Sequence, residues 1–495
     1  MTGVPAMVKN VQMPEFSVSN FVQLQKVYDS DTLQPMNNPA ERLSGIDSLM
    51  FALDHPGPPP VISGAFEFDR RLDFSHINAF IADRLLRHDR FRMRPSINTG
   101  FPVWVEDPSV DMDYHLCRST VAPPGGKKQV QALFTELSAE PLDPGKPLWR
   151  VHYIENTESK GSYLFFRVHH CIGDGISLVR LLLSITDTAV EAFENLPEND
   201  IPSQHAKRSK RKCHTVCDYA KKKIKTVISD PAQARQCAKN KRVALSEAAM
   251  TMARLLMLPP DRECFFNQPP TTLRRMAWTA PLPLDDIKKA GARFNATVND
   301  VIAALATGGL RRYLDQNGML QGKLPIRMAV PVNIRPREAA ISAQADLKNA
   351  FGFVLAPLPV FIQDPLRRLR RVSAILDQLK QSSDASVAWA AMNALGAVPP
   401  EFARKTAHLF AEKITGIISN VPGPDRELYF AGGKLKRILF WLPLVKGMGI
   451  GISAFSYNNI VSLGIVTDAQ MAPDPDAIAR HIEAEFNMIA IQCKT

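Results

Sequence analysis

Two periods of hydrophobicity run along the chain and predict a protein of mixed helices and strands. Residues 61–68 and 326–334 alternate between apolar and other side chains, which is typical of strands. Apolar residues recur at helical spacing in several longer segments, namely 43–51, 74–86, 282–294, 300–313 and 475–491. Residues 450–457 and 460–466 flank Asn458-Asn459 and predict a hairpin with a two-residue turn. Since both element types occur throughout the chain, the predicted fold class is α/β in each half.

The most informative stretch is a buried-strand pattern that ends in two histidines. The apolar run 163–168 is followed by His169, His170, Gly173, Asp174 and Gly175. A helical pattern begins at Ile176, and Asp174 or Ser177 is expected to cap it. The titratable groups therefore lie at the end of a rigid element, on a turn that two glycines allow to bend sharply.

His170 is the predicted general base. A histidine titrates near pH 6.5, so its neutral ring accepts a proton from an alcohol or thiol and later returns it. Asp174 lies too close in sequence for a free triad geometry and is expected to shape the turn by pairing with a cation. The alternative is that two histidines lie at a strand end by chance. A random chain of this length would match the whole His-His-x-x-x-Asp-Gly pattern in about one case in a thousand.

The positive charge of the chain is local. The formal net charge is +11, and residues 207–242 contain thirteen Lys/Arg against two acids, so the remainder is neutral. A solvated linker is the simplest interpretation of this run. A second is attraction to anionic lipid or to a polyanionic substrate, and the apolar, Met-rich pattern at 243–258 could lie in a membrane interface. Nucleic-acid binding is disfavoured because few aromatic residues interrupt the run.

The cysteines and the missing motifs exclude several classes. Seven scattered cysteines are an odd number and indicate reduced thiols in a cytosolic-facing compartment. Cys213, His214, Cys217 and Cys237 match no standard zinc spacing, so no metal site is predicted. The N-terminal residues lack a signal-peptide pattern, and no uncharged apolar run reaches the roughly 18 residues of a membrane span. A phosphate loop, a Rossmann fingerprint and a serine elbow are also missing.

The predicted organisation has four parts. They are an extension over 1–39, an N-terminal half over 40–200, a basic linker with an apolar helix over 201–264, and a C-terminal half over 265–495. His76, His88 and His115 have no companion at a useful spacing, so they are interpreted as structural or surface residues.

An ordered series of motifs runs through the chain from about Leu43 onward. The motifs are Leu43-Ser44-x-x-Asp47, Pro141-Leu142-Asp143, Pro147-Leu148-Trp149, His169-His170-x-x-x-Asp174-Gly175, Thr297-Val298-Asn299-Asp300-Val301, Pro331-Val332-Asn333-Ile334-Arg335, Ser419-Asn420-Val421-Pro422-Gly423-Pro424, and Ser456-Tyr457 with Gly464 and Asp468. This series resembles the bacterial and plant wax ester synthase/diacylglycerol acyltransferases of the CoA-dependent acyltransferase superfamily. One motif would indicate only the superfamily, whereas the series is specific.

The resemblance implies two chloramphenicol-acetyltransferase-like halves joined by a long crossover, with a tunnel between them. Acyl-CoA would enter from one face, and a fatty alcohol or diacylglycerol from the other. His170 would deprotonate the acceptor hydroxyl, which attacks the thioester directly without a metal, a cofactor or a covalent intermediate. Contact with a membrane or lipid droplet through 207–258, on the cytoplasmic side, is also expected.

The resemblance also implies roles for residues outside the histidine pair. Asn299 would hold the acceptor or the oxyanion. Removal of such a donor typically raises the activation barrier by about 3 kcal/mol. Arg335 is the expected partner of Asp174, by analogy with related acyltransferases. The remaining candidates are supporting residues His169, Gly175 and Asp300 and tunnel-lining or turn-shaping residues Trp149, Asn349, Ser419 and Asn420. Cys171 is not expected to be a nucleophile.

Three positions depart from the family pattern and affect the expected acceptor. They are Pro144 after Pro-Leu-Asp, Arg150 after Trp149, and Asn333 where serine is common. Two alternatives to the leading function are therefore kept: a superfamily acyltransferase with another hydroxyl acceptor, and a lipid-surface protein without turnover.

Overall fold

The computed structural model describes residues 41–54, 59–98, 100–188, 257–259, 261, 271, 273–320, 322, 325–335, 347, 349–445 and 447–494. The predicted N-terminal extension, the basic run and the cysteine-histidine group at 213–237 lie outside these residues. A two-residue strand, β1 (Glu41–Arg42), opens the described part. From Arg42 onward the described residues form one compact unit.

A six-stranded sheet carries the histidine motif. Its spatial order is β13 (Tyr429–Phe430), β14 (Gly433–Trp441), β2 (Val61–Phe68), β7 (Ser162–His169), β6 (Trp149–Glu155) and β5 (Leu116–Thr120). Only β5 and β6 pair in parallel. The sheet is accompanied by α3 (Phe74–Arg84), α4 (Met112–His115), α5 (Lys127–Ala139), α6 (Gly175–Ser184), η1 (Asp89–Phe91) and the hairpin of β3 (Met93–Asn98) and β4 (Phe101–Glu106).

The two halves are interleaved by a strand. β14 lies within residues 265–495, the predicted second half, and it pairs with β2 of the first half, with Ile438 opposite Phe66. An unpaired β2 would expose a row of backbone hydrogen-bonding groups at the sheet edge. The crossing strand covers that edge and ties the second half to the strand beside the histidine motif.

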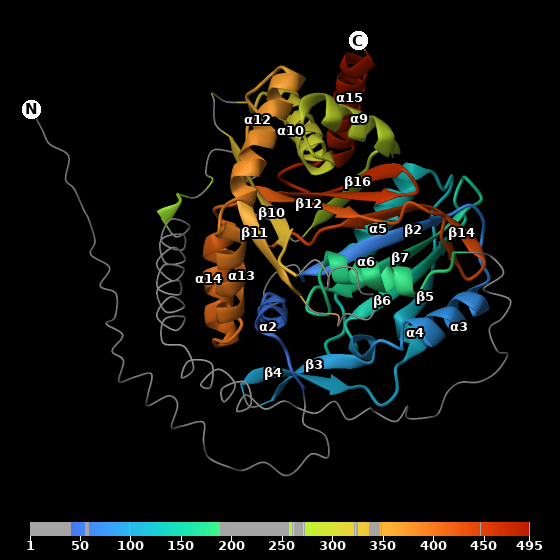
Figure 1. Ribbon diagram of the computed structural model, residues 1–495. Coiled ribbons are helices and arrows are strands. Elements are labelled where there is room, and N and C mark those ends of the chain that lie inside the picture. The colour runs from blue at the N-terminus through green and yellow to red at the C-terminus, as the bar shows by residue number, and fades with distance from the viewer. Residues whose placement is uncertain are drawn as a thin grey trace, which may run out of the picture. The chain divides into compact units, whose positions relative to one another are not determined.

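The second sheet has seven strands. The main order is β11 (Phe351–Leu358), β10 (Ile326–Asn333), β12 (Gly416–Pro422), β15 (Ile450–Tyr457), β16 (Ile460–Asp468) and β8 (Arg274–Trp278), and β9 (Leu282–Pro283) also pairs with β16. Four helices lie against it: α9 (Leu284–Phe294), α10 (Val298–Gln316), α12 (Pro365–Lys380) and α15 (Pro475–Lys494). Figure 1 shows these helices gathered on one side of the sheet. The predicted hairpin is confirmed, since Asn458 and Asn459 join β15 and β16 with φ of 45° and 60°.

The alternation of side chains along these strands separates the two faces of the second sheet. Met328 and Ile418 pack into the core beneath α10, α12 and α15, whereas their neighbours Ala329 and Ile417 face the other way. This second face looks toward the first half. A helix in the α9–α10–α12–α15 layer is therefore separated from the space between the halves by the thickness of the sheet.

An aromatic cluster joins the two sheets. Phe134 of α5 stacks on Phe165 of β7, with ring centroids 4.5 Å apart, and also contacts Trp278 and Trp441 of the second half. The indole nitrogen of Trp441 donates to the Ala277 carbonyl at 2.9 Å. Both halves therefore share one buried interface, and the predicted mixed α/β fold with two halves is confirmed.

Candidate active site

The β7–α6 loop carries both histidines and ends the strand as predicted. The His170 amide donates to the Pro60 carbonyl at 2.8 Å, and the Ile172 amide donates to the His169 carbonyl at 3.0 Å. Neither Gly173 nor Gly175 has a positive φ, so the turn does not depend on the left-handed freedom expected of glycine. The turn is instead fixed by hydrogen bonds.

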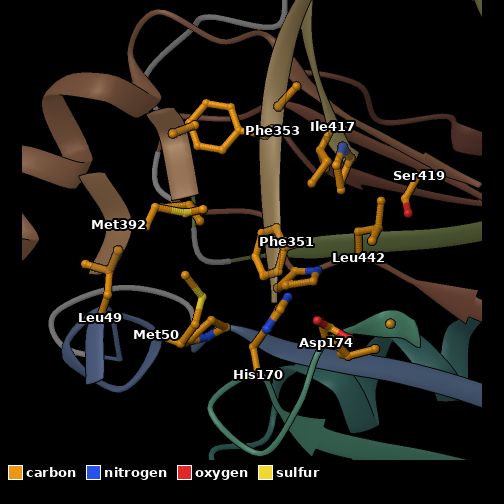
Figure 2. A pocket seen from close by; sticks show the side chains of 18 of the residues that line it. Leu49, Met50, His170, Asp174, Phe351, Phe353, Met392, Ile417, Ser419 and Leu442 are labelled. Atoms are coloured by element: carbon orange, nitrogen blue, oxygen red, sulfur yellow. The ribbon is translucent and has the colours of Figure 1, made fainter. Parts of the chain in front are cut away.

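The two histidines have different environments. His169 is buried, and its Nδ1 accepts a hydrogen bond from the Cys171 amide at 3.1 Å. Burial and the neighbouring His170 lower the pKa of His169 to about 3, so its ring is neutral and serves the turn. The ring of His170 is half-buried and points into a cavity beside Phe351 (Figure 2), with ring centroids 5.5 Å apart. Only His170 therefore faces open space.

His170 is held in its basic form. Burial lowers its pKa below the usual 6.5, against smaller opposing effects of its own carbonyl, the Asp174 carboxylate and Asn349. Its Nδ1 is buried, and Nε2 is the ring nitrogen left for the cavity. A neutral imidazole with an accessible Nε2 is suited to accepting a proton at neutral pH.

Asp174 is a structural carboxylate. Its Oδ1 accepts the Ser177 amide at 2.9 Å and caps α6, while Oδ2 accepts Arg335 Nη2 at 2.7 Å and the Ala350 amide at 2.8 Å. Arg335 Nη2 also donates to the Ser177 hydroxyl at 2.9 Å. The arrangement brings the expected pair of Asp174 and Arg335 together, and it joins the β7–α6 loop to the second half.

A second link across the halves ends on the backbone of His170. Asn349 Nδ2 donates to the His170 carbonyl at 2.7 Å and to Asp47 Oδ1 at 2.8 Å. Asp47 lies in α2 (Gly45–Ala52), where burial raises its pKa and Asn349 is the first opposing partner. Asn349 is therefore a clamp on the histidine loop, not a residue of the cavity wall. In the sequence, Asp47 belongs to a motif but had no predicted role. The signal for its role as a buried partner of Asn349 was a lone carboxylate within an apolar helical run.

The cavity that receives His170 has a volume of about 320 Å³ and lies between the halves. Figure 2 shows side chains from both halves around it. The polar side chains of its wall are His170, Asp174, Asn333, Ser419 and Asn420, and the rest of the wall is apolar. Much of the apolar wall comes from α2 and from α13 (Asp384–Leu395) and α14 (Pro400–Ala411), two helices that the sequence patterns did not predict. The site thus combines the imidazole of His170 and a few other polar side chains with a largely apolar wall.

The structure does not bring Asn299 to this cavity. Asn299 lies in the first turn of α10, in the helical layer on the opposite face of the second sheet, and it is not part of the cavity wall. Asp300 completes a capping box with Thr297 and contacts Ser373 and Lys380. The acceptor or oxyanion role expected of Asn299 therefore has no support in its position, because the Asn-Asp motif begins a structural helix.

The remaining candidates fall in two places. Ser419 and Asn420 of β12 line the His170 cavity, as does Gly175. Trp149 is fully buried and lines a second, neighbouring cavity; its indole nitrogen donates to the Phe91 carbonyl at 2.9 Å. His115 stacks on Trp149 and is a core residue, as expected. Among the described residues, no group of three His, Cys, Asp or Glu side chains is placed to hold a metal ion.

Comparisons with known proteins show the family of the chain. Residues 43–302 match the family model of the wax ester synthase/diacylglycerol acyltransferase catalytic domain, and residues 347–490 match the WS/DGAT C-terminal domain. The chain is 25% identical over 469 residues to the O-acyltransferase WSD of Acinetobacter baylyi, covering 90% of this chain and 96% of that protein. It is 29% identical over 408 residues to a protein of Mycobacterium tuberculosis named "Probable diacyglycerol O-acyltransferase tgs1", covering 81% and 84%.

A solved structure shares the fold. The wax ester synthase/diacylglycerol acyltransferase from Marinobacter aquaeolei VT8 aligns with a TM-score of 0.63 at 24% identity, over 92% of this chain and 100% of that one. The catalytic-domain model alone spans more than half of the residues, and it includes the histidine motif. The chain therefore belongs to the wax ester synthase/diacylglycerol acyltransferase family of O-acyltransferase enzymes.

Proposed function

We propose that this enzyme moves a long-chain acyl group from acyl-CoA directly to the hydroxyl of a fatty alcohol or a diacylglycerol, with His170 as the general base. The observation that carries the proposal is the neutral His170 ring facing an apolar cavity of about 320 Å³. An apolar wall suits two long alkyl chains, and the names of the family and its members supply the substrate classes. The proposed reaction requires neither a metal nor a cofactor.

The proposed step is a single displacement. His170 Nε2 accepts the proton of the acceptor hydroxyl as the oxygen forms a bond to the thioester carbon. The carbon–sulfur bond then breaks, and the CoA thiolate takes the proton back from the imidazolium. General base catalysis of this kind contributes about 10²- to 10⁴-fold.

The carbonyl oxygen of the thioester gains negative charge during this step and needs a donor. We assign that role to Ser419 and Asn420, which line the cavity on the second half, in place of Asn299. Loss of one such donor typically raises the barrier by about 3 to 4 kcal/mol. Asn333, also in the wall, is our candidate for a contact with the acceptor.

The direct test of this function is an acceptor panel with one acyl-CoA. The purified enzyme is supplied with hexadecanoyl-CoA and, in separate reactions, with fatty alcohols, diacylglycerol and other hydroxyl compounds. We expect free CoA thiol and ester to form in equal amounts only when a fatty alcohol or diacylglycerol is present. Turnover with another hydroxyl class alone would identify a different acceptor, and no acceptor-dependent thiol release would indicate a lipid-surface protein without turnover.

The Asn349 clamp predicts an effect on kcat. Asn349→Ala removes both hydrogen bonds that hold the His170 carbonyl and Asp47, so the base loses its position while the cavity wall stays intact. We expect kcat to fall by about 10- to 100-fold with little change in KM, since misplacement by an ångström has effects of this size. Steady-state kinetics measures the split. Asn317→Ala, which removes an amide-to-carbonyl bond at the far end of α10, is the matched control and should leave kcat unchanged.

Peripheral contact with an anionic lipid surface is part of the proposal. No described helix is long and apolar enough to cross a membrane. The thirteen basic residues of 207–242 are expected to attract the enzyme to anionic vesicles, and high salt to weaken that binding. Vesicle co-sedimentation should show binding to anionic but not to neutral vesicles. Equal binding by a variant that lacks 207–242 would contradict this part.

A further inference from the structure

A second cavity lies beside the first, between α6 and the six-stranded sheet. Its volume is about 100 Å³. Its wall consists of residues from α6 and the residue after it, from β2, β6, β7, β12, β14 and β15, and from the segment between α3 and β3. Figure 1 shows α6 lying over this sheet. The mechanism above does not use this space.

The wall of the second cavity offers no free polar side chain. Apart from two glycines, its residues are Ile, Leu, Val, Phe and Trp149, whose only polar atom already donates to Phe91. Water gains no hydrogen bonds in such a space, and apolar cavities of this kind stay dry and bind apolar ligands. The cavity is therefore suited to hydrocarbon.

The two cavities meet next to the catalytic loop. They share four wall residues, Ile62, Gly175, Val421 and Phe440. Gly175 follows Asp174 directly, and a Cβ built on it would lie 3.6 Å from Val421 Cγ2. A side chain at position 175 would thus contact Val421 on the opposite wall, and glycine leaves this position without one. An alkyl chain that starts near His170 would enter the second cavity past these shared residues.

We propose that the second cavity holds the distal methylene groups of the acyl donor; this inference rests on the function proposed above. Beyond the thioester carbonyl an acyl chain has no polar atom, which matches a wall without free polar groups. A diacylglycerol has two ester groups and a branch, which match the larger cavity with Asn333, Ser419 and Asn420. A water-sized group occupies about 30 Å³ in a liquid, so a volume of about 100 Å³ holds about three such groups, and the size of the cavity limits the length of the acyl chain.

Gly64 allows the cavity to be filled with little steric cost. It lies on β2 between Ile62 and Phe66, on the face that lines the cavity, and a Cβ there meets nothing closer than the Leu439 carbonyl at 3.5 Å. Valine also suits a strand better than glycine does. Gly64→Val is therefore expected to fold and to occupy the space proposed for the chain end.

The first experiment compares chain-length profiles. Gly64→Val should lower kcat/KM for hexadecanoyl-CoA at least tenfold, leave octanoyl-CoA within about twofold, and leave the profile over alcohol chain lengths unchanged. Ala391→Val, which narrows the first cavity, is the matched control and should change the acceptor profile instead. A changed alcohol profile in Gly64→Val, or an unchanged donor profile, would overturn the inference.

The second experiment measures occupancy without turnover. Trp149 is the one tryptophan of the five in the chain that lines either cavity. In the His170→Ala background, hexadecanoyl-CoA brominated at its terminal carbon should quench tryptophan fluorescence, and Gly64→Val or Trp149→Phe should abolish the quenching. Quenching that survives Trp149→Phe, or none at all, would overturn the inference even if Gly64→Val failed to fold. An enzyme that transfers no acyl group but shows Trp149-dependent quenching would refute the proposed function and retain this one.

Discussion

His170→Ala is expected to lower kcat/KM for ester formation from hexadecanoyl-CoA by about 10²- to 10⁴-fold, the usual contribution of a general base. The reason is that His170 is the titratable side chain of the wall with an accessible nitrogen, since Asp174 is fully engaged by Ser177, Arg335 and Ala350. Steady-state assay of thiol release with a fatty alcohol present measures the loss.

The loss must be separated from unfolding. His76→Ala on α3 removes an exposed histidine far from the loop and is expected to leave kcat/KM unchanged. Thermal unfolding of His170→Ala should remain cooperative, because the His170 backbone bonds to Pro60 and Asn349 are retained. Near-normal turnover in a folded His170→Ala variant would exclude His170 as the base.

The second large effect is expected on stability, at the Asp174–Arg335 pair that joins the halves. The two side chains are only 6% and 9% exposed. Asp174→Ala removes three accepted hydrogen bonds and leaves a buried guanidinium, so we expect the free energy of unfolding to fall by about 3 to 5 kcal/mol. Denaturant unfolding monitored by circular dichroism measures this change.

A double-mutant cycle tests whether the pair acts as a unit. Asp174→Ala with Arg335→Ala should cost less than the sum of the two single changes, because the second substitution removes the uncompensated charge. The exposed pair of Arg87 and Asp83, with an N–O distance of 2.6 Å, is the matched control and should show little coupling. Additive effects at Asp174 and Arg335 would contradict a bridging role.

Local patterns predicted the structure around the β7–α6 loop well because its signals lie close together in the sequence. The apolar run of β7, the turn and the cap of α6 follow one another within 23 residues, and each has its own signal in side-chain period or capping type. The Asn-Asn hairpin was predicted for the same reason. In contrast, the pairing of β14 with β2 joins residues far apart in sequence, and no local pattern identifies the distant strand that pairs with β2.

The position of Asn299 away from the cavity has a physical explanation that the sequence already contained. Thr297 and Asp300 have the spacing of a capping box, which is a signature of helix starts. The role expected of Asn299 came from the resemblance to a family motif and stays a prediction. Helix α13 was missed because alanine and other small residues occupy most of its positions, so apolar and polar positions contrast weakly. Helix α14 does contrast charged with large apolar positions, and this signal was available in the sequence.

Residues of the second half hold the loop that carries His170. Asn349, Ala350 and Arg335 all bond to the β7–α6 loop, and they come from the ends of neighbouring strands β10 and β11. The second half therefore supplies both the wall of the cavity and the restraint on the loop. Movement of one half against the other would change the position of His170.

Low pH is expected to affect both the protonation of His170 and the stability of the fold. Burial is the main reason why the pKa of His115 is lowered to about 4 and the pKa of His152 to about 3. In the unfolded state both imidazoles bind protons near pH 6.5. Stability is therefore complete above about pH 6.5 and is lost progressively as the pH falls toward those values. Any pH study of activity has to report the folded fraction at each pH.

The pH dependence of kcat/KM tests the central claim, that neutral His170 accepts the acceptor's proton. Because burial lowers the His170 pKa, kcat/KM of the folded enzyme should be level above about pH 6.5. At lower pH the logarithm of kcat/KM should fall by one unit per pH unit, with a midpoint below pH 6.5. This acid limb should be missing from the residual activity of His170→Ala. An acid limb of the folded wild-type enzyme with its midpoint above pH 6.5, or an acid limb that survives in His170→Ala, would contradict the account.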